Sequence, residues 1–491
     1  MRASPLRRIS NRTALFWSSI ETFSHQGIQL VVYIILARLV SPHDFGLVAM
    51  LAVFLAVAQS LSDSGFGNAL IQKQDDDDID RSTVFYFNLG VGITLSSVIY
   101  LSSGFIAGFY AEPALEPLTK VMSLVVLAAS IGLIQDALTR KQLDFRTRAK
   151  AAVIASVAAA AVSIPMAASG AGVWALAAQM IVMRVMQSAL LWAFCKWRPS
   201  LAFSITRLRS MFGFGFKLLI AGLLGAFFNN FYAMVIGRVY APVDVGFYSN
   251  AKRYQEYPAN NLTRIFSRFT FPAFSREQDD LARFQALFAK SLHASCLAVF
   301  PALGMLAGIA HPLFETVLGA KWLPSVPLFQ VLCIAGLFQP IASVNLNCLL
   351  ATGRSGHFLL LEIVKRLLFV IALALTFSYG VFWIVVGEAV TCVICYFVNT
   401  FFTQRILSIS SLQQLRLLGR ITAMTAVVGV SAYLGTMVQL APVGQLISGV
   451  ATGGIAGAAF MVCFDRSSLS MIVGTVNRFR SGATAASGPD A

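Results

Sequence analysis

The sequence predicts an all-α membrane protein with about fourteen transmembrane helices, arranged as two six-helix lobes plus two C-terminal helices. Three observations predict this fold. Hydrophobic residues make up 57% of the chain and charged residues only 12%, which is about half the charged fraction of a soluble globular protein. Apolar segments of about 20 residues, the length that crosses a bilayer as a helix, recur along the chain. A polar turn motif also occurs twice, with the two copies 200 residues apart.

The apolar segments are long enough to span a bilayer, and in lipid a segment of this kind satisfies its backbone hydrogen bonds only as a helix. The first segment continues to about residue 38 without a small-residue cleavage site, so we expect a retained helix and not a cleaved signal peptide. The predicted spans are 13–38, 44–72, 82–109, 117–139, 147–168, 173–195, 209–237, 243–263, 285–310, 323–350, 357–377, 381–403, 417–438 and 443–464.

Lys and Arg are distributed unequally between alternate loops. With the N-terminus in the cytoplasm, the basic clusters at 2–12, 140–150 and 196–217 all fall on the cytoplasmic side, and the opposite loops hold few basic residues. The positive-inside rule therefore predicts cytoplasmic N- and C-termini, with 466–491 as a flexible cytoplasmic tail. The net charge of +15 has the same explanation, and nucleic-acid binding is not needed to account for it.

The turn motif is the clearest sign of an internal repeat. In each copy an arginine ends one apolar segment, a proline lies in the turn, and we expect the aspartate to cap the next helix. The first copy is Arg38, Pro42, Asp44 and Gly46, and the second, 200 residues later, is Arg238, Pro242, Asp244 and Gly246. Six spans per copy preserve the orientation, so the repeat is parallel, and two such lobes enclose a cleft typical of alternating access. The predicted domains are an N-terminal lobe at 1–200, a C-terminal lobe at 201–405 and two extra helices at 406–465.

The sequence lacks the common motifs of nucleotide-binding proteins and hydrolytic enzymes. It contains no Walker A, GxSxG or HExxH pattern, and the CxxC of Cys392 and Cys395 stands alone in an apolar segment. We therefore predict that the protein is not an enzyme and holds no metal and no cofactor. The acidic run Asp75–Asp78 with Asp80 lacks EF-hand spacing, and we interpret it as a solvated loop whose aspartates cap the following helix.

Ionisable residues within spans are costly to bury, and each is a candidate for function. Among the cations within the predicted spans we single out five, namely Arg184, Lys252, Arg253, Lys365 and Arg366. They outnumber the carboxylates Glu256, Glu362 and Glu388 of the same helices, which favours a phosphate-bearing, anionic cargo. The alternative is local neutralisation at i,i+4 spacing, of Glu362 by Arg366 and of Glu256 by Lys252.

Carboxyl and imidazole groups in the first two spans are candidates for ion coupling. Glu21, His25 and Gln29 follow one another at i, i+4, i+8 and form a polar stripe on the first helix. Asp63 lies in the second span. We name Glu21, His25 and Asp63 as candidate sites for a coupling proton or Na⁺.

Several segments, taken together in their order and spacing, resemble the polysaccharide transporter family. These are the Wzx-type flippases of the multidrug/oligosaccharidyl-lipid/polysaccharide exporter superfamily. The segments are LARLVSPHDFGLVAM (36–50), SDSGFGNALIQKQD (62–75), IGRVYAPVDVGFYSNAKRYQEYP (236–258), FSRFTFPAFSREQDD (266–280) and LGAKWLPSVPLFQVLCIAG (318–336).

The resemblance implies a flippase that moves undecaprenyl-diphosphate-linked oligosaccharide from the cytoplasmic to the periplasmic leaflet of a bacterial inner membrane. It would serve exopolysaccharide or lipopolysaccharide biosynthesis, with a polysaccharide polymerase and a chain-length regulator as possible partners. The five cations would then bind the diphosphate, and candidate sugar contacts are Asn88, Asn229, Asn230 and Asn260. The alternatives are another cargo on the same fold, either a peptidoglycan precursor or a drug exchanged for a cation, or a non-transport role in an assembly complex.

Overall fold

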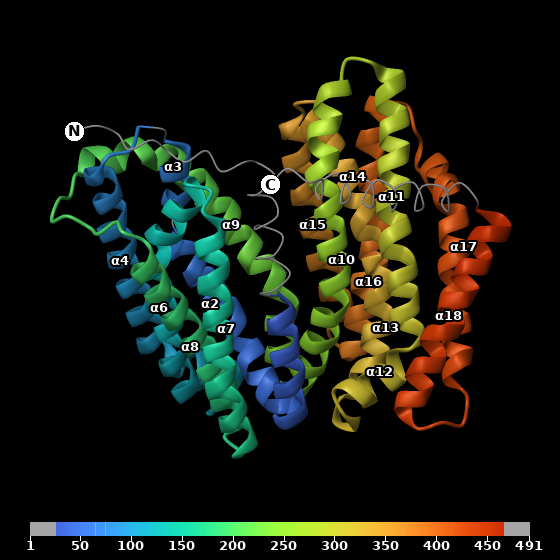
Figure 1. The fold of residues 1–491 in the computed structure, drawn as a ribbon, viewed down its shortest axis with the longest axis horizontal. Helices are drawn as coiled ribbons and strands as arrows, with labels where there is room; N and C mark the ends of the chain where they lie inside the picture. Colours follow the sequence, from blue (N-terminus) through green and yellow to red (C-terminus); the bar gives the residue numbers. More distant parts are fainter. Residues whose placement is uncertain (1–25, 64, 74, 466–491) are drawn as a thin grey trace, which may run out of the picture. The chain divides into compact units, whose positions relative to one another are not determined.

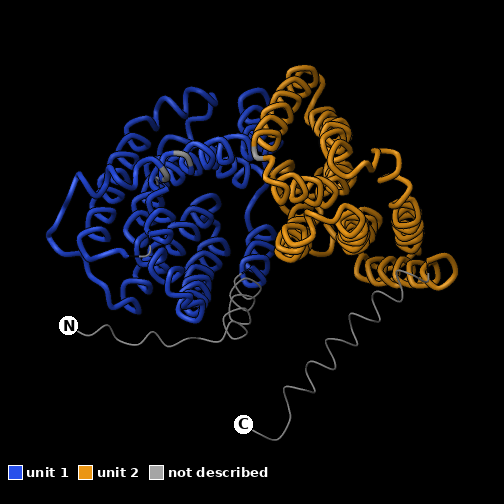
Figure 2. The backbone as a smooth tube through the Cα atoms, turned by 90° about the horizontal axis from the view of Figure 1, so that it is seen from above, with its two compact units in different colours: residues 1–246 blue, residues 247–491 orange. Residues whose placement is uncertain are grey.

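The computed structural model describes residues 26–63, 65–73 and 75–465, and these residues form helices without any β-strand (Figure 1). Glu21, His25 and the predicted tail lie outside the described residues. The chain divides into two compact units, Met1–Gly246 and Phe247–Ala491 (Figure 2). The all-α membrane fold predicted from the sequence is confirmed.

Unit 1 is built from helices that pack side by side. Helix α6 packs against both α4 and α8, and α7 packs against α8. Its helices are Gln26–Leu39, α2 (Pro42–Asp63), α3 (Phe66–Gln72), α4 (Asp78–Leu101), α5 (Ser103–Tyr110), α6 (Leu115–Lys141), α7 (Phe145–Ala168), α8 (Val173–Phe194) and α9 (Ile205–Val239). Helix α9 packs on α2 and α3 and so belongs to unit 1, whereas the repeat places residues 201–239 in the second lobe. The lobe limits taken from the repeat stay predictions.

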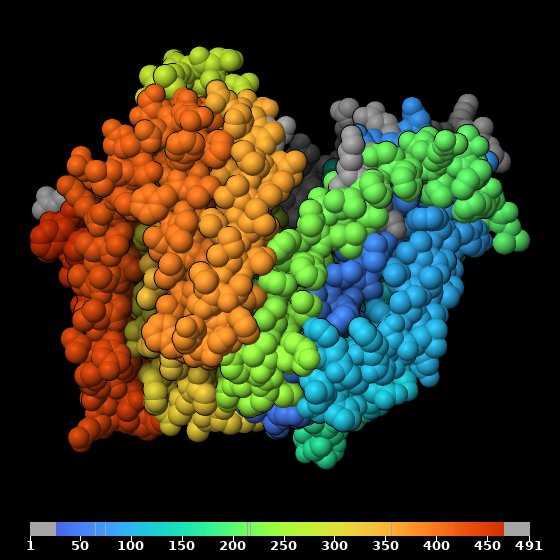
Figure 3. Space-filling model, turned by 180° about the vertical axis from the view of Figure 1, so that it is seen from behind, coloured from blue at the N-terminus to red at the C-terminus, as the bar shows by residue number. Residues whose placement is uncertain are grey.

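Unit 2 contains the remaining helices. They are α10 (Pro242–Glu277, which begins in unit 1), α11 (Leu281–Gly308), α12 (Ala310–Val317), the 3₁₀ turn η1 (Ala320–Trp322), α13 (Ser325–Gly336), α14 (Phe338–Ala351), α15 (Ser355–Thr376), α16 (Val381–Leu407), α17 (Ser411–Thr436) and α18 (Pro442–Phe464). Helices α17 and α18 pack closely on each other, and α17 packs on α11. Helices α17 and α18 form one edge of the unit, coloured orange to red in Figure 3.

Among the described residues, eleven helical segments are long and apolar enough to cross a membrane. Three other predicted spans are helical but fall outside this set. The described part of the first, Gln26–Leu39, is short, whereas α10 and α15 carry several charged residues each. The total of fourteen therefore stays a prediction. The two charged helices carry four of the five candidate cations, Lys252 and Arg253 on α10 and Lys365 and Arg366 on α15.

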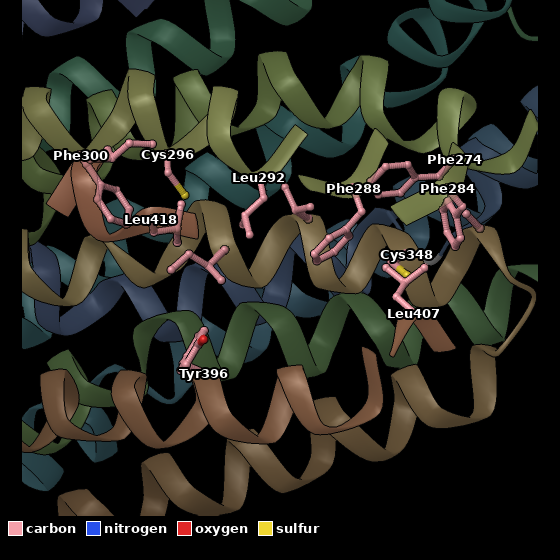
Figure 4. Close-up of a cluster of buried hydrophobic side chains, with 14 residues drawn as sticks. Phe274, Phe284, Phe288, Leu292, Cys296, Phe300, Cys348, Tyr396, Leu407 and Leu418 are labelled. Atoms are coloured by element: carbon pink, nitrogen blue, oxygen red, sulfur yellow. The ribbon is translucent and has the colours of Figure 1, made fainter. Parts of the chain in front are cut away.

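An aromatic core holds α10, α11, α14, α16 and α17 together in unit 2 (Figure 4). Phe274 of α10 meets Phe284 of α11 edge to face, with ring centroids 5.2 Å apart, and stacks on Phe288 at 6.2 Å. All three rings are buried, and aromatic side chains bury more apolar area than any others. This core fixes the end of the long helix α10 and thereby orients its charged middle.

The two copies of the turn motif pack directly against each other. A Cβ added to Gly46 would lie 1.7 Å from the carbonyl oxygen of Pro242, and one added to Gly246 would lie 2.0 Å from that of Pro42. Each glycine therefore lets the backbone of the other copy approach to a distance that a side chain forbids. The sequence repeat is thus also a reciprocal backbone contact between the starts of α2 and α10.

The predicted capping role of the motif's aspartates is wrong. In the first copy Ser41 caps α2, because its hydroxyl accepts a hydrogen bond from the Asp44 amide at 3.2 Å and donates one to the Asp44 carboxylate at 2.6 Å. In the second copy Ala241 precedes Pro242 and has no polar side chain. Asp44 and Asp244 instead lie in the first turns of α2 and α10, where a carboxylate interacts favourably with the helix dipole.

The acidic loop before α4 caps that helix as the sequence predicts, but it is not fully solvated as predicted, because the side chains of Asp76 and Asp80 are only 4% and 0% exposed. Asp77 is the N-cap of α4 and forms a capping box with Asp80. Arg81 pairs with Asp76 at 2.6 Å, Lys141 of α6 also pairs with Asp76, and Arg207 of α9 reaches Asp80 at 3.2 Å. Burial alone would raise the pKa of Asp76, but the hydrogen bonds from Arg81 and Lys141 hold this pKa below its ordinary value. The loop therefore joins one end of α4 to the ends of α6 and α9.

Candidate functional site

Arg184 is the candidate anion ligand of unit 1. It lies near the middle of α8 and is exposed, and it makes no hydrogen bond or ion pair with another described residue. Asp136 of α6 is close enough to act on it electrostatically, but that carboxylate already binds Arg140 at 2.5 Å and Arg148 at 2.9 Å. Within the described part of unit 1, Arg184 thus has a guanidinium available for a ligand.

A neutral polar cluster joins three span-forming helices of the same unit. Gln29, on the helix Gln26–Leu39, donates a hydrogen bond to Ser156 of α7 at 3.2 Å. Gln179 of α8 donates to the Gln29 side-chain oxygen at 3.1 Å. The sequence placed Gln29 on a polar stripe but gave no signal for Ser156 or Gln179, since single polar residues on three distant helices have no shared spacing.

Asp63, the described member of the predicted ion-coupling set, lies at the end of α2. Its Oδ1 atom is buried and has no hydrogen-bond partner among the described residues. A buried carboxylate oxygen without a partner is costly and is a reasonable place for a proton. The coupling role of Asp63 stays a prediction, as do the roles of Glu21 and His25.

Lys252 and Glu388 form the candidate site of unit 2, together with Tyr248. The Lys252 ammonium donates hydrogen bonds to Glu388 Oε1 at 3.0 Å and to the Tyr248 hydroxyl at 2.9 Å. That hydroxyl in turn donates to Glu388 Oε2 at 3.0 Å, which closes a triangle between α10 and α16. The sequence-based alternative paired Lys252 with Glu256, but the structure gives it a partner on another helix.

The charges of α15 pair within their own helix. Glu362 binds Lys365 and lies 3.7 Å from Arg366, so the predicted i,i+4 pairing of Glu362 with Arg366 is confirmed. The fifth candidate cation, Arg253, is exposed on α10 beside Lys252. Binding of a diphosphate by these side chains stays a prediction.

The four asparagines proposed to contact sugars have different surroundings. Asn88 is completely buried, and both of its amide atoms lack a hydrogen-bond partner among the described residues. Asn230 donates to the Ala226 carbonyl at 2.8 Å, and Asn260 accepts a hydrogen bond from Gln339. Asn229 is exposed on α9. Contact of these four asparagines with sugars stays a prediction.

In the described part of the chain, no group of three or more His, Cys, Asp or Glu side chains is placed to hold a metal ion. Cys392 and Cys395 are both free thiols on α16. What the two units offer chemically is hydrogen-bond donors and cations inside helices of membrane-spanning length, which suits the binding of an anion in a transporter.

The fold and these charges define a polytopic α-helical membrane protein with polar side chains inside its helices, and comparison with known proteins identifies the family. Residues 35–327 match the family described as polysaccharide biosynthesis protein, and the chain belongs to that family. It is 30% identical over 368 residues to the lipopolysaccharide biosynthesis protein WzxC of Escherichia coli (strain K12), with 73% of each chain covered. It is 24% identical over 333 residues to the succinoglycan biosynthesis transport protein ExoT of Rhizobium meliloti (strain 1021), with 67% of this chain and 66% of that one covered.

Solved structures share the fold. The lipid II flippase MurJ in an inward closed conformation superimposes with a TM-score of 0.75 and 12% identity, covering 93% of this chain and 100% of MurJ. An inward-facing multidrug resistance transporter of the MATE family gives a TM-score of 0.59 and 15% identity over 80% of this chain and 99% of that one. At these identities the likeness establishes the fold alone, and it agrees with the exporter superfamily expected from the sequence.

Proposed function

We propose that this protein is a flippase that moves undecaprenyl-diphosphate-linked oligosaccharide from the cytoplasmic to the periplasmic leaflet of a bacterial inner membrane. The oligosaccharide would enter exopolysaccharide or lipopolysaccharide synthesis. Transport would proceed by alternating access, with the diphosphate on the basic side chains and the polyprenyl tail in lipid. The N- and C-termini would both lie in the cytoplasm.

The observation that carries this proposal is the exposed guanidinium of Arg184, which has no hydrogen-bond or ion-pair partner among the described residues and lies in a span-length helix of a polysaccharide-biosynthesis membrane protein. A cation at membrane depth is expensive unless something neutralises it. Guanidinium groups bind phosphate through two parallel, charge-assisted hydrogen bonds. A cargo that brings phosphate supplies the charge that the described neighbours of Arg184 do not.

Membrane potential could drive the proposed movement without ATP. Moving one charge across 100 mV changes its free energy by about 2.3 kcal/mol. A diphosphate with two negative charges that leaves an inside-negative cell would therefore gain about 4.6 kcal/mol at 100 mV. Coupling to a proton or Na⁺ at Asp63, Glu21 or His25 is a separate proposal, as is association with a polymerase and a chain-length regulator.

The test is a flipping assay with the purified full-length protein in liposomes. The liposomes carry a fluorescent undecaprenyl-diphosphate oligosaccharide, and a membrane-impermeant quencher or glycosidase reports which leaflet it occupies. We expect protein-dependent exchange between leaflets, made faster by an inside-negative potential. Parallel arms replace the cargo with lipid II or with a cationic dye.

Three outcomes would overturn the proposal. Exchange of lipid II alone would indicate a peptidoglycan-precursor flippase. Uptake of the cationic dye without movement of the oligosaccharide would indicate a drug antiporter. Movement of no substrate, from protein that remains folded and correctly inserted, would favour a non-transport role in an assembly complex.

A further inference from the structure

Lys252 is held by a carboxylate that comes from a different helix. We infer that Glu388 is a built-in competitor for Lys252, which occupies the place of an anionic cargo group and must give up the lysine when a diphosphate binds there. This inference rests on the proposed function and assigns Glu388 the role of setting how tightly the site holds the cargo's diphosphate.

The geometry of the triangle goes beyond local neutralisation. Glu256, one turn along α10 from Lys252, would be the nearest partner on a helix, yet Lys252 reaches across to Glu388 on α16 at 3.0 Å. The Tyr248 hydroxyl holds the second carboxylate oxygen at 3.0 Å. Both oxygens of Glu388 are therefore positioned, and the carboxylate is presented to Lys252 in a fixed orientation.

The site is sheltered but still reachable. The Lys252 side chain keeps 23% of its surface exposed and that of Glu388 keeps 12%. At such positions charges interact more strongly than in bulk water. A phosphate that approached Lys252 would meet the negative charge of Glu388 at the same contact distance, so the two anions would compete for one cation.

Competition of this kind serves a transporter, because cargo must be released as well as bound. A lysine without a counter-ion would hold a diphosphate tightly and delay its departure, whereas Glu388 can take the lysine back as the cargo leaves. The pair on α15 differs, since Glu362 contacts Lys365 and Arg366 of its own helix. A pair within one helix keeps its geometry when helices move, and a pair between α10 and α16 does not.

Binding of inorganic pyrophosphate and of undecaprenyl diphosphate to the purified full-length protein in nanodiscs tests the inference. Glu388→Gln keeps the size of the side chain and removes its charge, and we expect affinity for both probes to rise about tenfold. Tyr248→Phe removes one of the two anchors of the carboxylate and should give a smaller rise. Lys252→Gln should weaken binding, and in the Lys252→Gln background Glu388→Gln should no longer tighten it.

Glu256→Gln is the matched control, because it removes a neighbouring carboxylate that makes no hydrogen bond or ion pair to Lys252 in this arrangement. Its effect should be clearly smaller than that of Glu388→Gln. In the flipping assay Glu388→Gln should lower the concentration of cargo at half-maximal rate and also lower the maximal rate. A merely structural pair would not produce that combination.

The outcomes separate the two proposals. Equal or weaker binding by Glu388→Gln, with Lys252→Gln still impaired, would overturn the competitor role and leave the flippase intact. If Glu388→Gln and Glu256→Gln raised the affinity for diphosphate equally, the change would reflect the loss of any nearby negative charge. That result would also overturn the competitor role of Glu388. Failure of the unmodified protein to bind either diphosphate would contradict the proposed function itself. If Glu388→Gln does not fold, Tyr248→Phe becomes the deciding variant. Its affinity for diphosphate must exceed that of the unmodified protein for the inference to stand.

Discussion

The two units carry positive charge in their span-length helices in different ways. In unit 1, Arg184 has no hydrogen-bonding or ion-pair partner among the described residues. In unit 2, Lys252 is bound by Glu388, and Lys365 and Arg366 share Glu362. An anion can therefore bind at Arg184 without breaking an existing pair, but at Lys252 it has to displace a carboxylate. The difference teaches that the number of cations in a unit does not by itself set its capacity to bind an anion.

The largest effect is expected at Arg184. Arg184→Gln should reduce flipping of the lipid-linked oligosaccharide about 100-fold or more, because two charge-assisted hydrogen bonds to phosphate are lost. The measurement is export of the polymer in cells that lack the native gene, together with quantification of the protein in the membrane.

Arg209→Gln is the control for that variant, since Arg209 is an exposed arginine near the start of α9 and lies outside the span assigned to that helix, Leu218–Val239. It should export normally. Normal export by Arg184→Gln, at normal protein levels, would remove the contrast between the units and with it the observation on which the proposed function depends.

The next effect concerns the reciprocal contact between the two copies of the turn motif. Gly46→Ala and Gly246→Ala each put a Cβ against a backbone carbonyl that cannot move as a flexible side chain can. Each should lower the free energy of unfolding by about 1–3 kcal/mol, measured as a lower melting temperature in detergent. Gly90→Ala in α4 is the control, because a Cβ there meets no atom within 4 Å. Unequal losses at the two glycines would show that the contact is less symmetric than the geometry indicates.

What could be predicted from the sequence was local. Helix periodicity and length gave the helices, and the acidic run before α4 gave its capping box, because both depend on residues within a few positions of each other. The same local reasoning failed at Asp44, where the cap is Ser41, three residues earlier and one position before the helix begins. It was right for Glu362 and Arg366 because that pair also lies within one turn.

What could not be predicted required knowing which helices touch. The pairing of Lys252 with Glu388 and the hydrogen bonds between Gln29, Gln179 and Ser156 join residues more than a hundred positions apart. No spacing rule links such residues, since packing of helix faces decides their neighbours. The polar character of each residue was visible, but its partner was not.

A smaller loss is expected in unit 2. Lys365→Gln should reduce flipping about tenfold or less, because Arg366 remains beside Glu362 and can supply positive charge to the same region. The measurement is the initial flipping rate in liposomes, compared with Arg184→Gln in the same preparation. A loss as large as that of Arg184→Gln would contradict the idea that cations paired with a carboxylate in unit 2 contribute less than Arg184.

The smallest effect is expected outside the spans, in the acidic loop before α4. The pKa of Asp76 is held below its ordinary value of 3.8, so its ion pairs stabilise the fold fully above that value, and the contribution is lost as pH falls through the lower, folded pKa. Asp76→Asn should therefore lower the melting temperature slightly at pH 6, and its difference from the unmodified protein should shrink at pH 3. Asp75→Asn, at an exposed neighbour, should change little at either pH. A difference for Asp76→Asn that grew towards pH 3 would mean that the carboxylate is not stabilised by Arg81 and Lys141, and that the loop does not join α4 to α6 through charge.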